Sequence, residues 1–88
     1  DESLARKYFE KAASHGDNRA SFNLAMMEEQ KKNYMGAYQW YELSARDGML
    51  DNKVISLSEG KKTALAANLT QDQIRTARDR ADKWIQAQ

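Results

Sequence analysis

The side chains that carry reactive chemistry are few in this sequence, and they are scattered. His15 is the single histidine and there is no cysteine, so the imidazole has no thiol with which to complete a metal site. Glu28 and Glu29 are adjacent carboxylates, but neighbouring residues on a helix point about 100° apart and do not converge on one substrate. No Ser/His/Asp arrangement, phosphate loop or zinc spacing is present. We therefore predict that the protein is not an enzyme and uses no cofactor or metal.

Phe22 and Met26 have the types and the spacing of a partner-binding surface. They lie one helical turn apart and away from the stripe that packs the same predicted helix, which is Ala20, Leu24 and Met27. An aromatic ring and a thioether on an open groove can hold a partner's helix or extended peptide. The alternative is that a neighbouring helix covers both residues.

Two other groups of residues allow a binding role beside a simpler structural one. Lys61 and Lys62 could steer an acidic partner, although paired lysines are also common on solvated helix faces. Trp40 and Trp84 could be recognition platforms, but both fall in or beside apolar stripes, which favours packing in the core.

Apolar residues recur at steps of three and four along nearly the whole chain, which predicts helices. The pattern predicts five antiparallel helices with short loops: Glu2 to Ser14, Asn18 to about Lys31, Tyr34 to Asp47, a fourth after Asp51 to about Asn68, and a fifth after Thr70. Asp17, Asn33 and Asp51 are candidate N-caps, and Gly16 and Gly48 are candidate helix stops. No segment alternates as a strand does, so the predicted fold class is all-α.

The fifth helix has the clearest local signal. Thr70 and Gln73 have the spacing of a capping box, in which each side chain bonds the backbone of the other residue. One apolar stripe follows it, made of Ile74, Ala77, Ala81, Trp84 and Ile85. A terminal helix with a single buried face is predicted to seal the end of a stack of helices.

Two segments of the chain repeat one pattern. The matching positions are 32 residues apart: Ala5 and Ala37, Tyr8 and Trp40, Phe9 and Tyr41, Glu10 and Glu42, Ala12 and Ser44, Ala13 and Ala45, Gly16 and Gly48. A period in this range is typical of stacked helical units. The repeat therefore predicts related surroundings for paired residues such as Tyr8 and Trp40.

Composition limits the classes of partner. With 88 residues the chain is expected to form one domain, and its net charge of +1 comes from interspersed residues of both signs. There is no basic stripe of the kind that nucleic-acid-binding proteins carry, and no apolar run of the ~18 residues that a membrane span requires. We expect neither nucleic-acid binding nor a membrane span.

The repeat resembles the Sel-one-like repeat (SLR) family of the tetratricopeptide-repeat superfamily. The resemblance is carried by A-Y-Q-W-Y-E-L-S-A-R-D-G at 37–48, by Y-F-E-K-A-A-S-H-G-D at 8–17, and by the tail L-T-Q-D-Q-I…A…A-D-K-W at 69–84. It implies antiparallel helical hairpins stacked as a short α-solenoid, at the C-terminal end of a bacterial repeat array. The expected units are a partial repeat (1–16), a complete repeat (17–48), the first helix of a degenerate repeat (49–68) and a capping helix (69–88). Such a chain would be a piece of a longer protein or a processed one.

In that superfamily the first helix of each hairpin lines the concave wall. By position, the resemblance implies a partner-binding groove whose lining is Arg19, Phe22, Met26, Glu29, Gln30, Val54, Ser58, Lys61 and Lys62, with Asp51 beside them.

The expected function is a non-catalytic protein–protein interaction module, within a larger scaffold or regulatory protein, that binds a peptide or protein in this groove. Two alternatives stay open: a purely structural capping segment of a larger protein, or a small stand-alone inhibitor or immunity protein. The resemblance favours a periplasmic or secreted location, and a cytoplasmic one also stays open. The identity of the partner and the oligomeric state are not fixed by the sequence.

Overall fold

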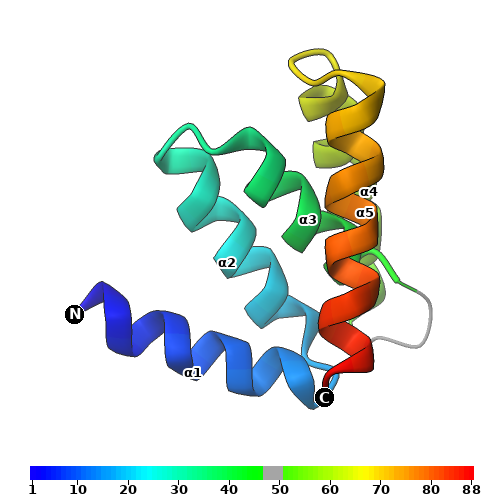
Figure 1. The fold of residues 1–88 in the computed structure, drawn as a ribbon. Coiled ribbons are helices and arrows are strands. Elements are labelled where there is room, and N and C mark those ends of the chain that lie inside the picture. Colours follow the sequence, from blue (N-terminus) through cyan, green and yellow to red (C-terminus); the bar gives the residue numbers. More distant parts are fainter. Residues whose placement is uncertain (47–50) are drawn as a thin grey trace.

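The computed structural model describes residues 1–46 and 51–88, which form five α-helices (Figure 1). In chain order they are α1 (Glu2–Ser14), α2 (Asn18–Gln30), α3 (Tyr34–Ser44), α4 (Asn52–Ala66) and α5 (Gln71–Gln86). These described stretches contain no strand, so the predicted all-helical fold class is confirmed for them.

Local capping explains where the helices begin. The side chains of Asp17, Asn33 and Asp51 each accept a hydrogen bond from a backbone N–H in the first turn that follows. Thr70 and Gln73 form the predicted capping box: the Gln73 N–H donates to Thr70 Oγ1 at 3.1 Å, and the Thr70 N–H donates to Gln73 Oε1 at 2.9 Å. The four predicted N-caps are therefore confirmed.

Helix ends were predicted less well than helix starts. Gly16 takes the left-handed conformation expected at the end of α1, with φ +87°. Lys32 takes the same conformation after α2, with φ 63°, although nothing in its residue type favours it. The third helix ends at Ser44 and the fourth at Ala66, both earlier than predicted. The predicted stop at Gly48 lies outside the described residues.

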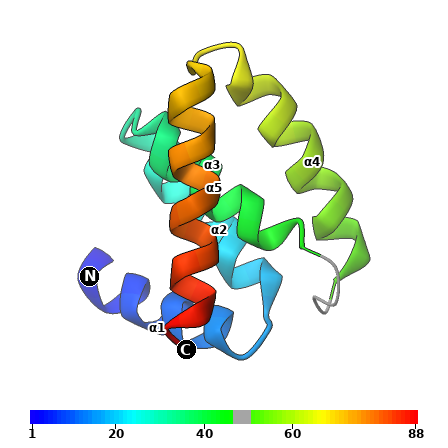
Figure 2. The ribbon, with the colours of Figure 1, turned by 45° about the vertical axis from the view of Figure 1, so that its right-hand side comes forward.

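Helix α3 is the centre of the molecule, and α2, α4 and α5 all pack on it. Its Ala37 and Tyr41 are fully buried, together with Leu24 of α2 and Ala77 of α5. Figure 1 shows α5 running beside α3, with α1 at the edge of the molecule. Figure 2 shows α4 and α5 diverging from the turn that joins them, so that each packs on α3 more than on the other.

Two aromatic pairs pack between the helices of this core. The rings of Trp40 and Trp84 meet edge-to-face with their centroids 5.3 Å apart, which joins α3 to α5. The rings of Phe22 and Tyr41 make the same arrangement at 5.3 Å and join α2 to α3. Edge-to-face contact matches the positive rim of one ring to the negative face of the other. Both tryptophans are thus packing residues, which was the favoured interpretation of the sequence.

The predicted similarity of the two repeat copies is wrong for one pair. Trp40 is 6% exposed, whereas Tyr8, its counterpart 32 residues earlier, is 70% exposed. The reason is that Trp84 of α5 covers Trp40, while Tyr8 borders a surface hollow between α1 and α2 that none of the described helices covers in this way. Equivalent sequence positions therefore do not have equivalent surroundings here.

Candidate functional site

Helices α2 and α4 run in the same direction, and a buried side chain joins their beginnings. The Asn18 amide, which is 0% exposed, donates through Nδ2 to the carbonyl oxygens of Ser44 at 3.1 Å and Asp51 at 2.9 Å. Its Oδ1 accepts from the Asp51 N–H at 3.1 Å. Burying an amide costs desolvation free energy, which hydrogen bonds offset. The partners of Asn18 are backbone groups at the end of α3 and at the start of α4. Asn18 therefore sets the spacing of the two helices.

The far halves of α2 and α4 enclose a surface hollow of about 310 Å³. We call it the α2–α4 hollow, and its lining is Met26, Glu29, Gln30 and Lys61. All four belong to the groove that the sequence predicted, three from one helix and one from the other. The structure thus brings these four residues together. Met26 is 40% exposed, so a thioether and its methyl group are open to solvent there.

A buried phenol holds Glu29 in place. The Tyr41 hydroxyl donates to Glu29 Oε1 at 2.7 Å, and Tyr41 itself is fully buried. Burial raises the pKa of Tyr41 well above its usual value, and the hydrogen bond and negative charge of Glu29 raise it further. The phenol is therefore a permanent donor at physiological pH, and it fixes the carboxylate at the wall of the hollow.

Two of the predicted groove residues are in the core. Val54 is 9% exposed and Ser58 is 0% exposed, and the Ser58 hydroxyl forms a hydrogen bond with the hydroxyl of Ser44 on α3. The structure therefore corrects the prediction that Val54 and Ser58 line an open groove. The reason is the rotation of α4 about its axis, which turns this face toward α3.

Three further groove candidates lie apart from the α2–α4 hollow. Phe22 is half-buried and packs against the core through Tyr41. Arg19 is exposed and pairs with Asp17 at 3.2 Å, at the other end of α2. It borders a separate hollow of about 250 Å³ between α1 and α2, whose lining is Tyr8, Phe9, Ala12, Asp17, Arg19, Ala20 and Asn23. Asp51 is used in capping α4 through its bonds to the N–H groups of Lys53 and Val54.

The predicted lysine pair is divided between two environments. The Lys62 ammonium lies 2.9 Å from Glu42 Oε1, 3.5 Å from Glu59, and 5.8 Å from the centroid of the Tyr38 ring. Burial alone would lower the pKa of Lys62, but the hydrogen bond and charge of Glu42 outweigh it and raise the pKa. Lys62 is therefore a structural cation between α3 and α4, and Lys61 is the one that faces the hollow.

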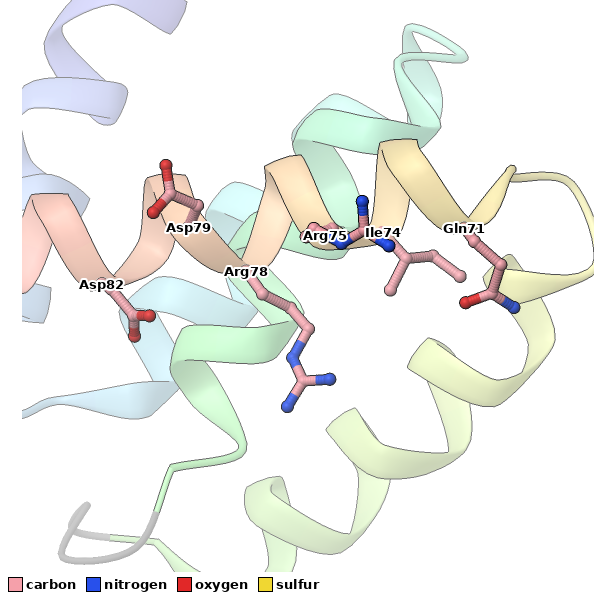
Figure 3. Close-up of a pocket in the computed structure, with 6 residues that line it drawn as sticks. All are labelled: Gln71, Ile74, Arg75, Arg78, Asp79 and Asp82. Atoms are coloured by element: carbon pink, nitrogen blue, oxygen red, sulfur yellow. The ribbon is translucent and has the colours of Figure 1, made fainter.

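A further hollow, of about 400 Å³, lies along α5 (Figure 3). Its lining mixes both signs of charge: Gln71, Ile74, Arg75, Arg78, Asp79 and Asp82. In Figure 3 the Arg78 side chain points toward the space between α5 and the neighbouring helices, and Asp79 points away from it. Arg78 lies 3.7 Å from Glu42, and Asp82 lies 2.6 Å from Arg46. These ion pairs join α5 to α3 and to the residues that follow α3.

The residues with catalytic potential stay apart in the structure. Glu28 pairs with Arg6 of α1, while Glu29 accepts from Tyr41, so the two carboxylates have different partners. The Nδ1 atom of His15 lies 2.8 Å from the Lys11 carbonyl at the end of α1. Among the described residues, no three His, Asp or Glu side chains gather as a metal site would require. None of the described helices combines the length and the apolarity needed to cross a bilayer.

One exposed apolar residue, on the face of α4 that carries Lys61, was not among the predicted site residues. Leu57 is 58% exposed and precedes Lys61 by one turn of α4, which places both on the same face. The signal in the sequence was the four-residue spacing of Lys53, Leu57 and Lys61. This spacing was overlooked because Val54 and Ser58, on a different face of α4, also have the four-residue spacing expected of a groove.

Comparisons of the chain with family models, with curated proteins and with solved structures found no match. The resemblance to the SLR family therefore rests on the three sequence segments at 8–17, 37–48 and 69–84.

Proposed function

We propose that this protein is a non-catalytic protein–protein interaction module that binds a peptide or protein partner over the α2–α4 hollow. One observation carries the proposal: Met26, Glu29, Gln30 and Lys61, from two helices, line a single open hollow in which Met26 is 40% exposed. The proposal includes the finer architecture, a short α-solenoid of the SLR type with α5 as its cap, within a larger scaffold or regulatory protein.

The chemistry of the α2–α4 hollow suits a protein surface better than a small substrate. Its volume of about 310 Å³ is at the low end of ligand pockets, which are usually about 300–1,000 Å³ and mostly enclosed. A thioether adapts its shape to many apolar side chains, and an amide, a carboxylate and an ammonium beside it fix direction through polar contacts. Such a mixture fits one or two side chains of a partner.

The direction of the helices supports the solenoid part of the proposal. Helices α2 and α4 run parallel, with Asn18 joining their beginnings, while α3 returns antiparallel between them. First helices of consecutive units that stand side by side form the continuous inner wall of a helical repeat array.

A purely structural role, as the capping segment of a larger protein, is the second candidate. It is favoured by α5, whose Ala77 and Ala81 are buried and whose Trp84 covers Trp40. In this case α5 ends the stack, and the α2–α4 hollow has no partner.

Selection of peptides from a displayed random library of 16-residue sequences, with the whole chain as bait, separates the two candidates. We expect binders whose affinity falls about ten-fold or more in Met26→Asp, because a carboxylate replaces the apolar contact at the centre of the site. The melting temperature should stay within about 2 °C, since Met26 is exposed.

The matched control is Leu4→Asp, which makes the same kind of change at a residue that is 65% exposed on α1. Binding should survive it. A library that returns no binder sensitive to Met26→Asp would favour the structural capping role.

A further inference from the structure

Helix α4 presents a row of three exposed residues, Lys53, Leu57 and Lys61, at steps of four. Residues at this spacing lie above one another on one face of a helix. Leu57 is 58% exposed, so the row places an open apolar side chain between two ammonium groups. A buried or structural role does not explain this order of residues.

Helix α2 carries a second row at the same spacing, Phe22, Met26 and Gln30. Helices α2 and α4 run in the same direction and contact each other, and Lys61 shares the α2–α4 hollow with Met26 and Gln30. One side of the α2–α4 hollow is therefore thioether and amide. The other side is the ammonium of Lys61, from which Leu57 and Lys53 continue along the same face of α4.

The charges of the two rows do not cancel. Within the described residues neither Lys53 nor Lys61 forms an ion pair, whereas Lys62 is paired with Glu42 and Glu59. Arg19, at the lower end of α2, is paired with Asp17. The one carboxylate in the α2–α4 hollow is Glu29, which already accepts a hydrogen bond from Tyr41. The hollow itself holds one ammonium and one carboxylate, and Lys53 adds an unpaired positive charge on the same face of α4.

We propose that the partner bound by this groove is an acidic amphipathic helix. Its apolar face contacts Met26 and Leu57, and its carboxylates pair with Lys53 and Lys61. This inference rests on the proposed function and adds the chemistry of the partner to it. Complementary charge selects the partner and speeds its approach, while the apolar contact holds it.

The spacing of the two lysines sets the spacing of the carboxylates. Eight residues separate Lys53 from Lys61, which is a rise of about 12 Å along α4. A partner helix lying along the groove spans the same length with acidic residues seven or eight positions apart and apolar residues between them. An extended peptide rises ~3.3 Å per residue and would cover it in about four residues.

A helix suits this groove better than an extended strand. The walls are helices whose backbone groups are bonded internally, so they offer no edge to pair with a strand. A partner helix satisfies its own backbone hydrogen bonds and needs only side-chain contacts from the groove.

The test uses the peptides selected on the wild-type chain and their affinities for two double variants. Lys53→Glu with Lys61→Glu reverses the charge of the row, and Lys7→Glu with Lys11→Glu makes the same change on α1, away from the groove. We expect selected peptides to carry Asp or Glu seven or eight positions apart. Their affinity should fall about ten-fold or more in the first variant, as the loss of two pairs and the gain of repulsion imply, and change less than about two-fold in the second.

Reversing the charge of the peptide is the decisive control. A peptide in which Lys replaces the two acidic residues should prefer the Lys53→Glu/Lys61→Glu variant over the wild type, because the pairing is restored with opposite signs.

Three outcomes would count against the inference. Peptides that lose binding in Met26→Asp but are neutral, or are indifferent to the charge reversal, overturn the acidic partner and leave the proposed function standing. Acidic residues four positions apart, together with no gain in helical circular dichroism on binding, overturn the helical partner. The absence of any binder sensitive to Met26→Asp overturns both proposals.

Discussion

Lys61 and Lys62 are neighbours in the sequence, and the structure gives them different roles. The Lys62 ammonium is held by Glu42 at 2.9 Å and is largely buried, while Lys61 lines the α2–α4 hollow. Consecutive residues on a helix point about 100° apart, so one of a pair can face the core while the other faces solvent. Two adjacent charged residues in a helix can therefore have different roles, and each role has to be tested separately.

Lys32 has a backbone conformation that destabilises the folded protein relative to a glycine at the same position. Its φ of 63° costs a side chain with a Cβ roughly 1–2 kcal/mol, and glycine avoids this cost. We expect Lys32→Gly to raise the free energy of unfolding by about 1 kcal/mol in urea denaturation. Lys31→Gly is the control, because Lys31 has φ −85° and should lose stability. Equal effects of the two changes would contradict the role assigned to the left-handed conformation.

Tyr41 makes stability depend on pH in the alkaline range. Its pKa is raised in the folded protein, so the neutral phenol contributes stability that is complete below pH of about 10 and is lost as the pH rises further. Tyr41→Phe should lower the free energy of unfolding by about 1 kcal/mol at pH 7, because it removes the hydrogen bond to Glu29. The variant has no phenol at this position to titrate.

The difference in unfolding free energy between wild type and Tyr41→Phe is the quantity to measure, at pH 8, 10 and 11. The advantage of the wild type should shrink above pH of about 10, by up to about 1.4 kcal/mol per pH unit for one proton. The other tyrosines and the lysines titrate in both proteins and cancel. A constant difference across this range would show that Tyr41 is not held neutral by its surroundings.

At the scale of helices, single side chains decide which elements stand together. Helices α2 and α4 both begin with Asp-Asn, at Asp17-Asn18 and Asp51-Asn52. The first asparagine is buried and bonds Ser44 and Asp51, while Asn52 is exposed. Asp17 and Asp51 were predicted correctly as N-caps, because capping is local. The dipeptide could not show which asparagine joins two helices, because this depends on what packs beside it.

Glu42 joins three helices through its charge. Its side chain, on α3, is 12% exposed and lies near Lys62 of α4, Arg78 of α5 and Arg46, which follows the end of α3. We expect Glu42→Gln to cost about 2 kcal/mol of unfolding free energy, because it leaves partly buried cations without their shared anion. Glu59→Gln, at a side chain that is 58% exposed, should cost less than about 0.5 kcal/mol. Urea denaturation of the two variants at one ionic strength makes the comparison, and equal losses would remove Glu42 from this role.

At the scale of the whole molecule, the helices differ in how far they are covered. Leu4 and Tyr8, one turn apart on α1, are 65% and 70% exposed, whereas Trp40 on α3 is 6% exposed. Helix α3 has neighbours on several sides, and α1 packs on α2. The repeated sequence is therefore placed in two positions of unequal packing.

This inequality predicts unequal costs of mutation. Trp40→Ala should lower the free energy of unfolding by about 3–5 kcal/mol, as large-to-small changes at buried aromatic residues do. Tyr8→Ala should cost less than about 1 kcal/mol, because most of its surface is already in water. Chemical denaturation measures both. Comparable losses would mean that Tyr8 is covered in solution.

Part of the candidate site could be predicted from the sequence. Met26, Glu29, Gln30 and Lys61 were expected in one groove, and the structure brings them together there. Leu57 was missed, since an exposed leucine has the same residue type as a buried one. Val54 and Ser58 were placed on the wrong side, because the face that α4 turns to the core depends on its packing against α3.

The sequence alone determined that this chain is helical, where the helices start, and that no set of residues has the spacing of a known catalytic motif. These properties depend on residues within three or four positions of one another, so they are readable without a fold. Only the tertiary structure decided which face of α4 is buried, which of Lys61 and Lys62 lines the α2–α4 hollow, and why Trp40 is covered and Tyr8 is not. The rotation of a helix about its axis is set by contacts with residues far away in the chain, and no local pattern records them.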